Sequence, residues 1–280
     1  MAALKNKIDF ALVISVNHAN PNGDPLDGNR PRTTFDGRGE ITDVCLKRKI
    51  RNRLQDEGYP IFVQSDDRRS DEFRSLKARA NSIPELKRLF KERDDRGYAQ
   101  KACGIWLDVR SFGQVFAFGG EENAGGTSIP VRGPVTIQSA FSVDPVEITS
   151  TQIVKSVNLE TNEKDPGKKG SDTMGMKHRV DSGIYVTYGS MNVQLAEKTG
   201  FSEEDAEALK EAMLTLFFND ASSARPDGSM EVLKLAWWKH NCKNGQYSSA
   251  KVHRSLTVHP DGSIELAELP ELTPEVFDGR

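Results

Sequence analysis

The sequence predicts an α+β domain whose main elements follow the order strand, helix, strand, strand, helix, strand. Residues Ile8–Val16 alternate large apolar side chains with smaller ones, which is typical of a strand. Thr42–Glu57 places apolar residues at helical spacing, and Ser202 with Asp205 predicts a capping box that begins a second helix. This order is that of a ferredoxin-like, or RRM-like, unit, although unrelated proteins share it.

Breaks in these patterns separate the other elements. A turn-rich loop, 17–39, follows the first strand, and the helix after it begins at Thr42 or Asp43 and ends at Gly58. Mixed charge over 59–100 predicts a helical insertion at the surface. The remaining elements are, in order, a strand at Val131–Val143 opened by Gly133-Pro134, a polar extended hairpin at 153–180, a strand at Ile184–Leu195, the helix from Ser202, a strand at Glu231–Lys239 and an acidic tail at 261–280.

Composition limits the class of protein. The 280 residues suffice for one domain with large insertions, and we expect a single domain over residues 1–280. No apolar run approaches membrane-spanning length, so no membrane partner is expected. Cys45, Cys103 and Cys242 are scattered, which suits a reducing cytoplasm and predicts three buried thiols rather than a zinc site. We therefore expect a cytoplasmic protein with no metal and no cofactor.

Charge is distributed unevenly along the chain, although the net charge is only −3. The charged residues of the tail from Asp261 are all acidic except Arg280, whereas those of the stretch 30–53 are mostly basic. A phosphate backbone responds to the local field rather than to the net charge, so this segregation favours a nucleic-acid partner. The basic residues of the stretch are Arg30, Arg32, Arg38, Lys47, Arg48, Lys49, Arg51 and Arg53.

The helix inside this basic stretch is the first candidate RNA site. Its five cations lie between Val44 and Gln55, a run that contains no acid. Cations three and four residues apart form a ridge that can follow successive phosphates. Because most surface helices interleave charges of both signs, we expect these five side chains to be unpaired and available to RNA. A merely solvated face is the alternative.

Two further segments carry candidate RNA ligands. In Asp108–Gly113, either Asp108 pairs with Arg110 in a structural role, or Arg110 and Ser111 bind phosphate while Phe112 stacks on a base. In Thr173–Arg179, methionines lie beside basic residues, and methionine can wedge between bases without demanding one identity. The candidates in and before this second segment are Lys168, Lys169, Met174, Lys177, His178 and Arg179.

These segments together resemble the backbone subunit family of type I CRISPR interference complexes, and most of all its subtype I-C member. The similarity extends from about Ile8 to Trp238, with several motifs in the family order. The runs that carry it are Asn20–Pro25, Asn29–Arg32, Thr42–Arg51, Asp108–Gly113, Val131–Val135 and Thr173–His178.

The resemblance implies an RRM-like palm, helical fingers at 59–100 and a protruding thumb hairpin at 153–180. It also implies that copies assemble head to tail along one CRISPR guide RNA (crRNA), with Met174 as the wedge at each subunit boundary. The partners implied are the crRNA, the target DNA strand through the guide, further copies of the chain, and the guide-processing, large PAM-reading and small subunits of Cascade. The phosphate ligands implied are Arg30, Arg32, Lys47, Arg48, Arg51, Arg110 and Arg132.

Catalytic patterns are missing from the sequence, so we expect no enzymatic activity. The five histidines are dispersed, and no HExxH, GxSxG or Walker sequence is present. One alternative is an endoribonuclease of related fold; distant relatives of the family cut target RNA with a loop aspartate, which Asp24 or Asp36 would supply. The other alternative is a general single-strand-binding module without a guide.

Overall fold

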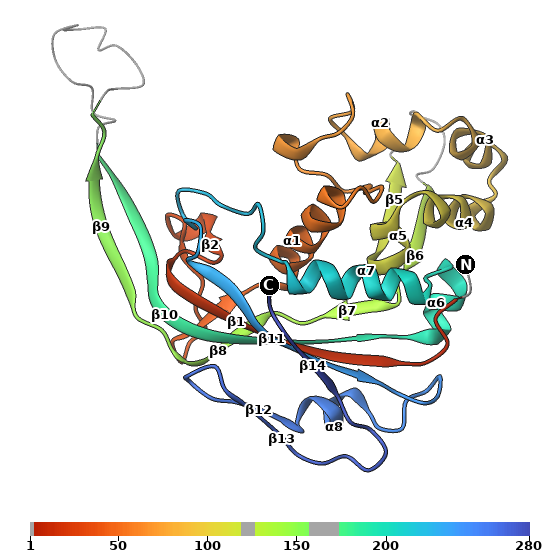
Figure 1. Ribbon diagram of the computed structural model, residues 1–280. Coiled ribbons are helices and arrows are strands. Elements are labelled where there is room, and N and C mark those ends of the chain that lie inside the picture. The colour runs from red at the N-terminus through yellow and green to blue at the C-terminus, as the bar shows by residue number, and fades with distance from the viewer. Residues whose placement is uncertain (1–2, 119–126, 157–173) are drawn as a thin grey trace, which may run out of the picture.

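A large antiparallel sheet is the centre of the molecule (Figure 1). The computed structural model describes residues 3–118, 127–156 and 174–280. Two of the strands, β7 (Val135–Ile137) and β9 (Ile148–Val154), pair with a central strand outside the main path. Along that path the sheet runs β14 (Glu275–Asp278), β11 (Met230–Lys239), β1 (Ile8–Ala19), β10 (Met174–Met191), β8 (Ala140–Pro145) and β4 (Arg38–Ile41).

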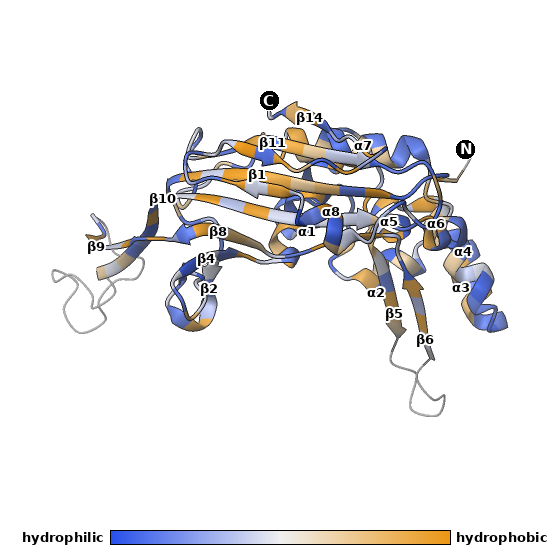
Figure 2. Ribbon diagram, turned by 90° about the horizontal axis from the view of Figure 1, so that it is seen from below, coloured by the Kyte–Doolittle hydropathy of each residue, from blue (hydrophilic) through white to orange (hydrophobic). Residues whose placement is uncertain are grey.

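Helices cover one face of this sheet. α1 (Asp43–Asp56), α6 (Val193–Thr199) and α7 (Glu203–Leu214) lie on the same side of it (Figure 1). The main hydrophobic core forms between these helices and the large apolar residues of β1, such as Leu12 and Ile14. Hydrophobic stretches of β1 and β11 mark the centre of the sheet in Figure 2. The predicted α+β class is confirmed at this level.

The opposite face of the sheet is covered as well. α8 (Ser249–His253) and the hairpin of β12 (Leu256–Val258) and β13 (Ile264–Leu266) lie beneath it (Figure 1). A second core packs the small face of β1 against this layer, through residues such as Ala11 and Trp238. The acidic tail predicted at 261–280 is part of this layered structure. It contains β13, which pairs with β12, and the edge strand β14, which is hydrogen-bonded to β11.

The inserted helices form a further packed unit. α2 (Leu76–Asn81), α3 (Pro84–Glu92) and α4 (Asp95–Ile105) are followed by α5 (Leu107–Phe112) and by the hairpin of β5 (Gly113–Phe118) and β6 (Thr127–Arg132). A third apolar cluster holds these elements together. This unit continues past residue 100, where the insertion was expected to end. Its core includes Phe62, Leu86, Tyr98, Trp106, Phe116 and Ile129.

The second half of the chain departs from the predicted strands at three places. β10 is one strand that begins at Met174, ten residues before the strand predicted from Ile184. Leu195, the predicted end of that strand, belongs to α6. The strand predicted at Val131–Val143 is divided into the end of β6, β7 and β8, because Gly133-Pro134 interrupts the pairing. β9 and the first part of β10 pair with each other and extend away from the sheet (Figure 1), as the hairpin prediction requires.

The cysteines differ in their exposure. Cys103 is buried, Cys45 is half-buried and Cys242 is exposed, so the expectation of three buried thiols is wrong for Cys242. No helix among the described residues is both long enough and apolar enough to span a membrane.

Candidate nucleic-acid interface

Local sequence determines where α1 begins and which face it buries. Thr42 is the N-cap, and its hydroxyl accepts a hydrogen bond from the backbone N–H of Cys45 at 3.3 Å. The side chain of Asn22 accepts from both the N–H and the hydroxyl of Thr42, which ties the preceding loop to the helix start. The predicted apolar stripe, Leu46, Ile50 and Leu54, is buried in the main core. The predicted helix is confirmed.

Most cations of α1 have partners in the folded chain, contrary to the expectation from the helix alone. The ammonium of Lys47 donates to Asp43 at 2.9 Å, one turn earlier. Arg51 donates through Nε to the buried carboxylate of Asp108 at 3.0 Å. The charge of the helix is therefore partly neutralised, by Asp43 at its own start and by acids from other parts of the fold.

Lys49 and Arg53 anchor α1 to the segment that follows α7. Lys49 is 3% exposed, and its ammonium pairs with Asp220 beside the ring of Phe217. Burial lowers the pKa of Lys49, although Asp220 opposes that shift. Arg53 donates to the hydroxyl of Thr215 at 3.1 Å and also pairs with Asp56 and Glu57. The expectation that Lys49 is a surface cation is wrong.

Arg48 is the cation of α1 that the fold leaves least satisfied. Its Nε donates to Asn52 at 3.0 Å, whereas its Nη2 is buried and has no hydrogen-bond partner among the described residues. Burial, and then the neighbouring Arg51, lower the pKa of Arg48 to about 10. The side chain stays protonated at neutral pH and forms no ion pair with a described carboxylate, so its charge is the least neutralised of the helix.

Asp108 and Arg110 do not pair with each other, so the predicted pairing is wrong, but each has a structural role with a different partner. Asp108 is 1% exposed and accepts from the backbone N–H groups of Phe62 at 2.7 Å and Val63 at 3.0 Å, besides Arg51. Arg110 makes a two-bond pair with Asp205, at 2.9 and 2.7 Å. Ser111 is fully buried, so its hydroxyl is not placed for contact with a ligand at the surface.

Phe112 and Arg132 come together through two glycines. Gly113, at φ +81°, pairs with Arg132 at the start of the β5–β6 ladder. A Cβ on Gly133 would lie 2.3 Å from the carbonyl oxygen of Ser111, so only glycine permits this close approach. The guanidinium of Arg51 lies 5.1 Å from the centre of the Phe112 ring. α1 and the two later motifs therefore meet at one place, with Arg132 exposed beside it.

The described arms of the β9–β10 hairpin expose two methionines. Met174 is 68% exposed and Met176 is 53% exposed, and the two share one face of β10 with His178 because side chains alternate along a strand. Val154, opposite Met174 in the ladder, is also exposed. Lys177 is exposed on the other face. The candidates Lys168 and Lys169 lie outside the described residues.

Polar contacts fasten the base of this hairpin on both faces. On the methionine face, Arg30 donates to the hydroxyl of Ser150 at 3.3 Å, and Ser150 is 2.8 Å from Nδ1 of His178. On the other face, Asp181 accepts from Thr149 at 2.7 Å and pairs with Arg179 at 3.3 Å. Arg32 is held in its own loop by Asp24 at 3.2 Å.

Sequence reasoning missed the acids and hydroxyls that complete these contacts. Asp220 and Ser150 have no motif around them, and only the fold brings them to Lys49 and Arg30. The predicted capping box of Asp205 is confirmed. Its ion pair with Arg110 could not be predicted, because no pattern in the sequence around either residue indicates it. Among the described residues, no group of three or more His, Cys, Asp or Glu side chains is arranged to hold a metal ion.

Comparison with known proteins places this architecture in a family. Residues 6–272 match the family model of CRISPR-associated protein Cas7. The chain is 27% identical over 288 residues to the CRISPR-associated protein Cas7 of Haloferax volcanii, covering 98% of this chain and 81% of that protein. One solved structure, a "CRISPR RNA-guided surveillance complex, pre-nicking", gives a TM-score of 0.48 at 17% identity, covering 87% of this chain and 81% of that one.

A second solved structure, a "CRISPR RNA-guided surveillance complex", gives a TM-score of 0.47 at 16% identity over 92% of this chain and 77% of that one. The family match spans nearly the whole described molecule, from β1 to the segment before β14. The chain therefore belongs to the CRISPR-associated protein Cas7 family.

Proposed function

We propose that the chain is the crRNA-binding backbone subunit of a Cascade-type interference complex of the I-C kind, and that it binds the guide without cutting it. Several copies would assemble head to tail along one guide, leaving most bases free to pair with target DNA. The guide-processing, large PAM-reading and small subunits would complete the complex. Membership of the Cas7 family supports this assignment.

The observation that carries the proposal is the guanidinium of Arg48, whose neighbour Arg51 lies over the ring of Phe112. Arg48 has a buried nitrogen without a hydrogen-bond acceptor, and a phosphate oxygen is the acceptor that it lacks. Its side chain as a whole is only half-buried, so a rotation presents that nitrogen to an anion. Phosphate contact by cations, with pairing left to the bases, is what sequence-independent guide binding requires.

We also propose that the sheet is an RRM-like palm, with α2–α4 as fingers and the β9–β10 hairpin as the thumb. The strand order β11-β1-β10-β8, with α1 after β1 and α7 before β11, supports the palm. The exposed methionine face supports a wedge role for Met174. The cytoplasm is the compartment expected for such a complex.

Co-purified RNA tests the assignment. We expect the protein, expressed with a CRISPR array and its processing subunit, to retain RNA of one discrete length, and gel analysis of the extracted RNA measures this. Heterogeneous RNA would instead favour a general single-strand-binding module. Absence of RNA from a protein that is folded and has full access to the array would contradict the proposal.

No ribonuclease or deoxyribonuclease activity is expected from the chain itself. Asp24 is occupied in capping the short helix that begins at Pro25 and in pairing with Arg32, while Asp36 accepts from Thr34. Labelled repeat RNA, single-stranded RNA and DNA are incubated with the protein, with and without magnesium or manganese. Cleavage that follows the protein through purification and is lost in Asp24→Asn or Asp36→Asn would show that the endoribonuclease alternative is correct.

We expect Arg30 to hold the orientation of the β9–β10 hairpin relative to the sheet rather than to bind phosphate, because its guanidinium donates to Ser150 of β9. Arg30→Ala and Ser150→Ala each remove this bond, but only the first removes a charge. We expect both variants to shorten the assemblies formed on a full-length guide, measured by size-exclusion chromatography with light scattering. Neither variant should change the slope of log affinity against log salt for a short RNA. If Arg30→Ala alone has an effect and its slope falls by about 0.7, Arg30 is a phosphate ligand.

A further inference from the structure

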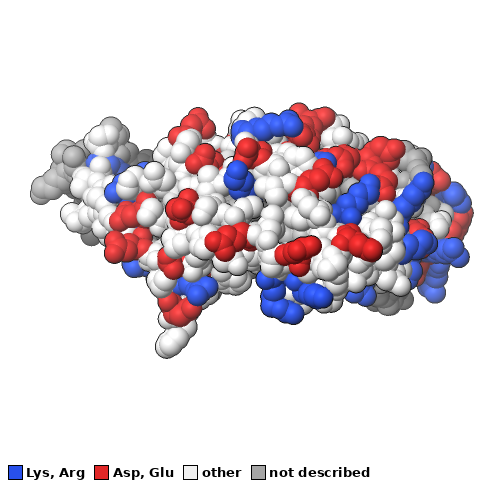
Figure 3. Space-filling model, turned by 60° about the horizontal axis from the view of Figure 1, so that its bottom comes forward, with Lys and Arg blue, Asp and Glu red and all other residues white. Residues whose placement is uncertain are grey.

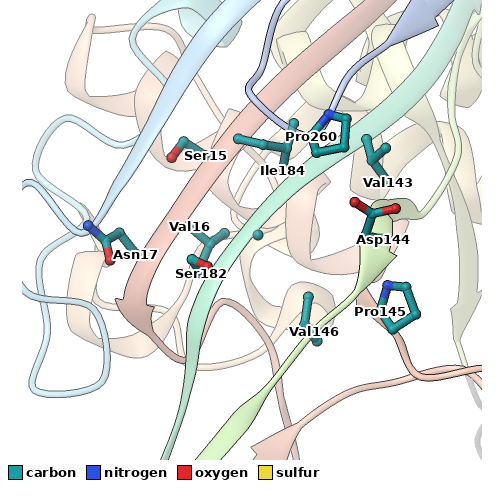
Figure 4. Close-up of a pocket in the computed structure, with 11 residues that line it drawn as sticks. Ser15, Val16, Asn17, Val143, Asp144, Pro145, Val146, Ser182, Ile184 and Pro260 are labelled. Carbon is teal, nitrogen blue, oxygen red and sulfur yellow. The ribbon is translucent and has the colours of Figure 1, made fainter.

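A polar cavity of about 410 Å³ opens on the sheet face that carries β12 and β13, opposite α1 and α7. Figure 4 shows the residues that line it. β1, β10 and β8 provide its floor and one wall, and Pro260, in the turn between β12 and β13, provides another. None of the described residues of the candidate RNA interface lines it. The cavity is therefore a separate feature of the molecule.

The floor of the cavity consists of two cross-strand pairs. Ser15 faces Ile184 and Asn17 faces Ser182 in the β1–β10 register, and residues directly opposite share one face of a sheet. The side chains of Ser15, Asn17 and Ser182 make no hydrogen bond within the described part of the chain. Two hydroxyls and one amide thus have free donors and acceptors.

The wall of the cavity carries an acid without a cation. Asp144 is exposed on β8 and forms no ion pair with any described residue. In Figure 4 its side chain stands between Pro145 and Pro260. Among the described residues, no Lys or Arg lines the cavity. The basic residue opposite Pro145 in the ladder, Arg38, already pairs with Asp36 at 3.3 Å.

Neighbouring carboxylates add to the negative charge of Asp144 around the cavity. Glu231 lies directly opposite Ser15 in the β1–β11 register, Glu147 follows Val146 of the lining, and Asp261 follows Pro260. These three acids form no ion pair in the described part of the chain. Acidic side chains are spread over this side of the molecule in Figure 3. Such a field repels phosphate and attracts cations.

We propose that this cavity is a docking site for an arginine side chain of a protein partner. A guanidinium has five donors in one plane, so it can make two bonds to the Asp144 carboxylate while its other donors face the hydroxyls of the floor. Its flat face and apolar stem pack against Pro145, Pro260 and Ile184. Lysine would neutralise the acid but satisfies fewer acceptors at once. RNA is disfavoured because its phosphates would approach four unpaired carboxylates.

Methyl NMR tests the site with N-acetyl-arginine amide as the probe. We expect a saturable shift of the Ile184 δ1 methyl, with the buried Ile50 methyl unmoved as evidence that the fold is intact. Replacing the probe by N-acetyl-citrulline amide, or the protein by Asp144→Asn, should weaken binding at least tenfold. The matched control, Glu275→Gln, removes an exposed and unpaired acid of β14, outside the lining, and should leave binding unchanged.

Three results would overturn the inference. They are an unmoved Ile184 methyl, equal shifts with the citrulline probe, and equal binding by Asp144→Asn. A single-stranded RNA hexamer that shifts Ile184 when the arginine probe does not would assign the cavity to RNA instead. Asp144→Asn is expected to retain full RNA affinity, so failure of this inference is distinguishable from failure of the proposed guide-binding function.

Discussion

Replacing Arg110 with alanine is expected to lower the free energy of unfolding by about 3–5 kcal/mol. Asp205 is only 5% exposed, and the two-bond pair with Arg110 is the compensation for its buried charge. Removing Arg110 leaves that carboxylate with the backbone N–H of Ser202 but without a cation. Urea denaturation of the variant and the parent protein measures the difference.

Two further variants make the Arg110 result specific. Arg132→Ala removes an exposed arginine without an ion pair among the described residues and should change stability by no more than about 0.5 kcal/mol. Arg110→Met with Asp205→Asn removes both charges while the asparagine can still cap α7, and it should recover part of the loss. A loss below about 1 kcal/mol in Arg110→Ala would show that the pair contributes little, and Arg110 would return as a candidate phosphate ligand.

The double variant Lys47→Ala/Arg48→Ala is expected to lose RNA affinity by roughly a hundredfold or more at moderate salt. Each charge-assisted bond to phosphate contributes roughly 1.5–3 kcal/mol, part of which the Lys47–Asp43 pair already offsets. The loss should be the same for every RNA sequence, because phosphate contacts carry no base information. Fluorescence anisotropy at several salt concentrations should show a slope reduced by about 1.4, or 0.7 for each contact.

The control for this variant removes the same net charge from another helix. Lys87→Ala/Lys91→Ala takes away two exposed lysines of α3 that have no ion pair among the described residues. An equal fall in affinity in both double variants would mean that only net charge matters and that α1 is a solvated face. Arg51 is left in place, because it supports the buried carboxylate of Asp108 and its loss would confound binding with folding.

Short-range patterns were enough to place several elements. The hydroxyl of Thr42 and the spacing of Leu46, Ile50 and Leu54 determine the start and the buried face of α1, since both depend on residues within one or two turns. The same holds for the capping box of Ser202 at α7. The strand divisions after residue 131 were less predictable, because pairing with β10 decides where β7 and β8 end.

Long-range pairing could not be read from the sequence. Lys49 and Arg51 looked free because residues 44–55 contain no acid, yet their acidic partners lie 171 and 57 residues away along the chain. The Thr215 hydroxyl, which accepts from Arg53, lies 162 residues away. Separations of this size leave no periodic signal, whereas burial makes an unpaired charge costly and so selects a partner once the chain is folded.

The sequence by itself determined the α+β class, the helix start at Thr42, the hairpin arms and the stretch 30–53 as the basic segment. Only the tertiary structure decided which of these cations remain for a ligand. In the folded chain Lys49 is buried, and Arg51 and Arg110 form ion pairs with Asp108 and Asp205. One nitrogen of Arg48 has no acceptor among the described residues. The physical reason is that local periodicity fixes the face on which a side chain lies, while the packing of distant segments fixes what it meets there.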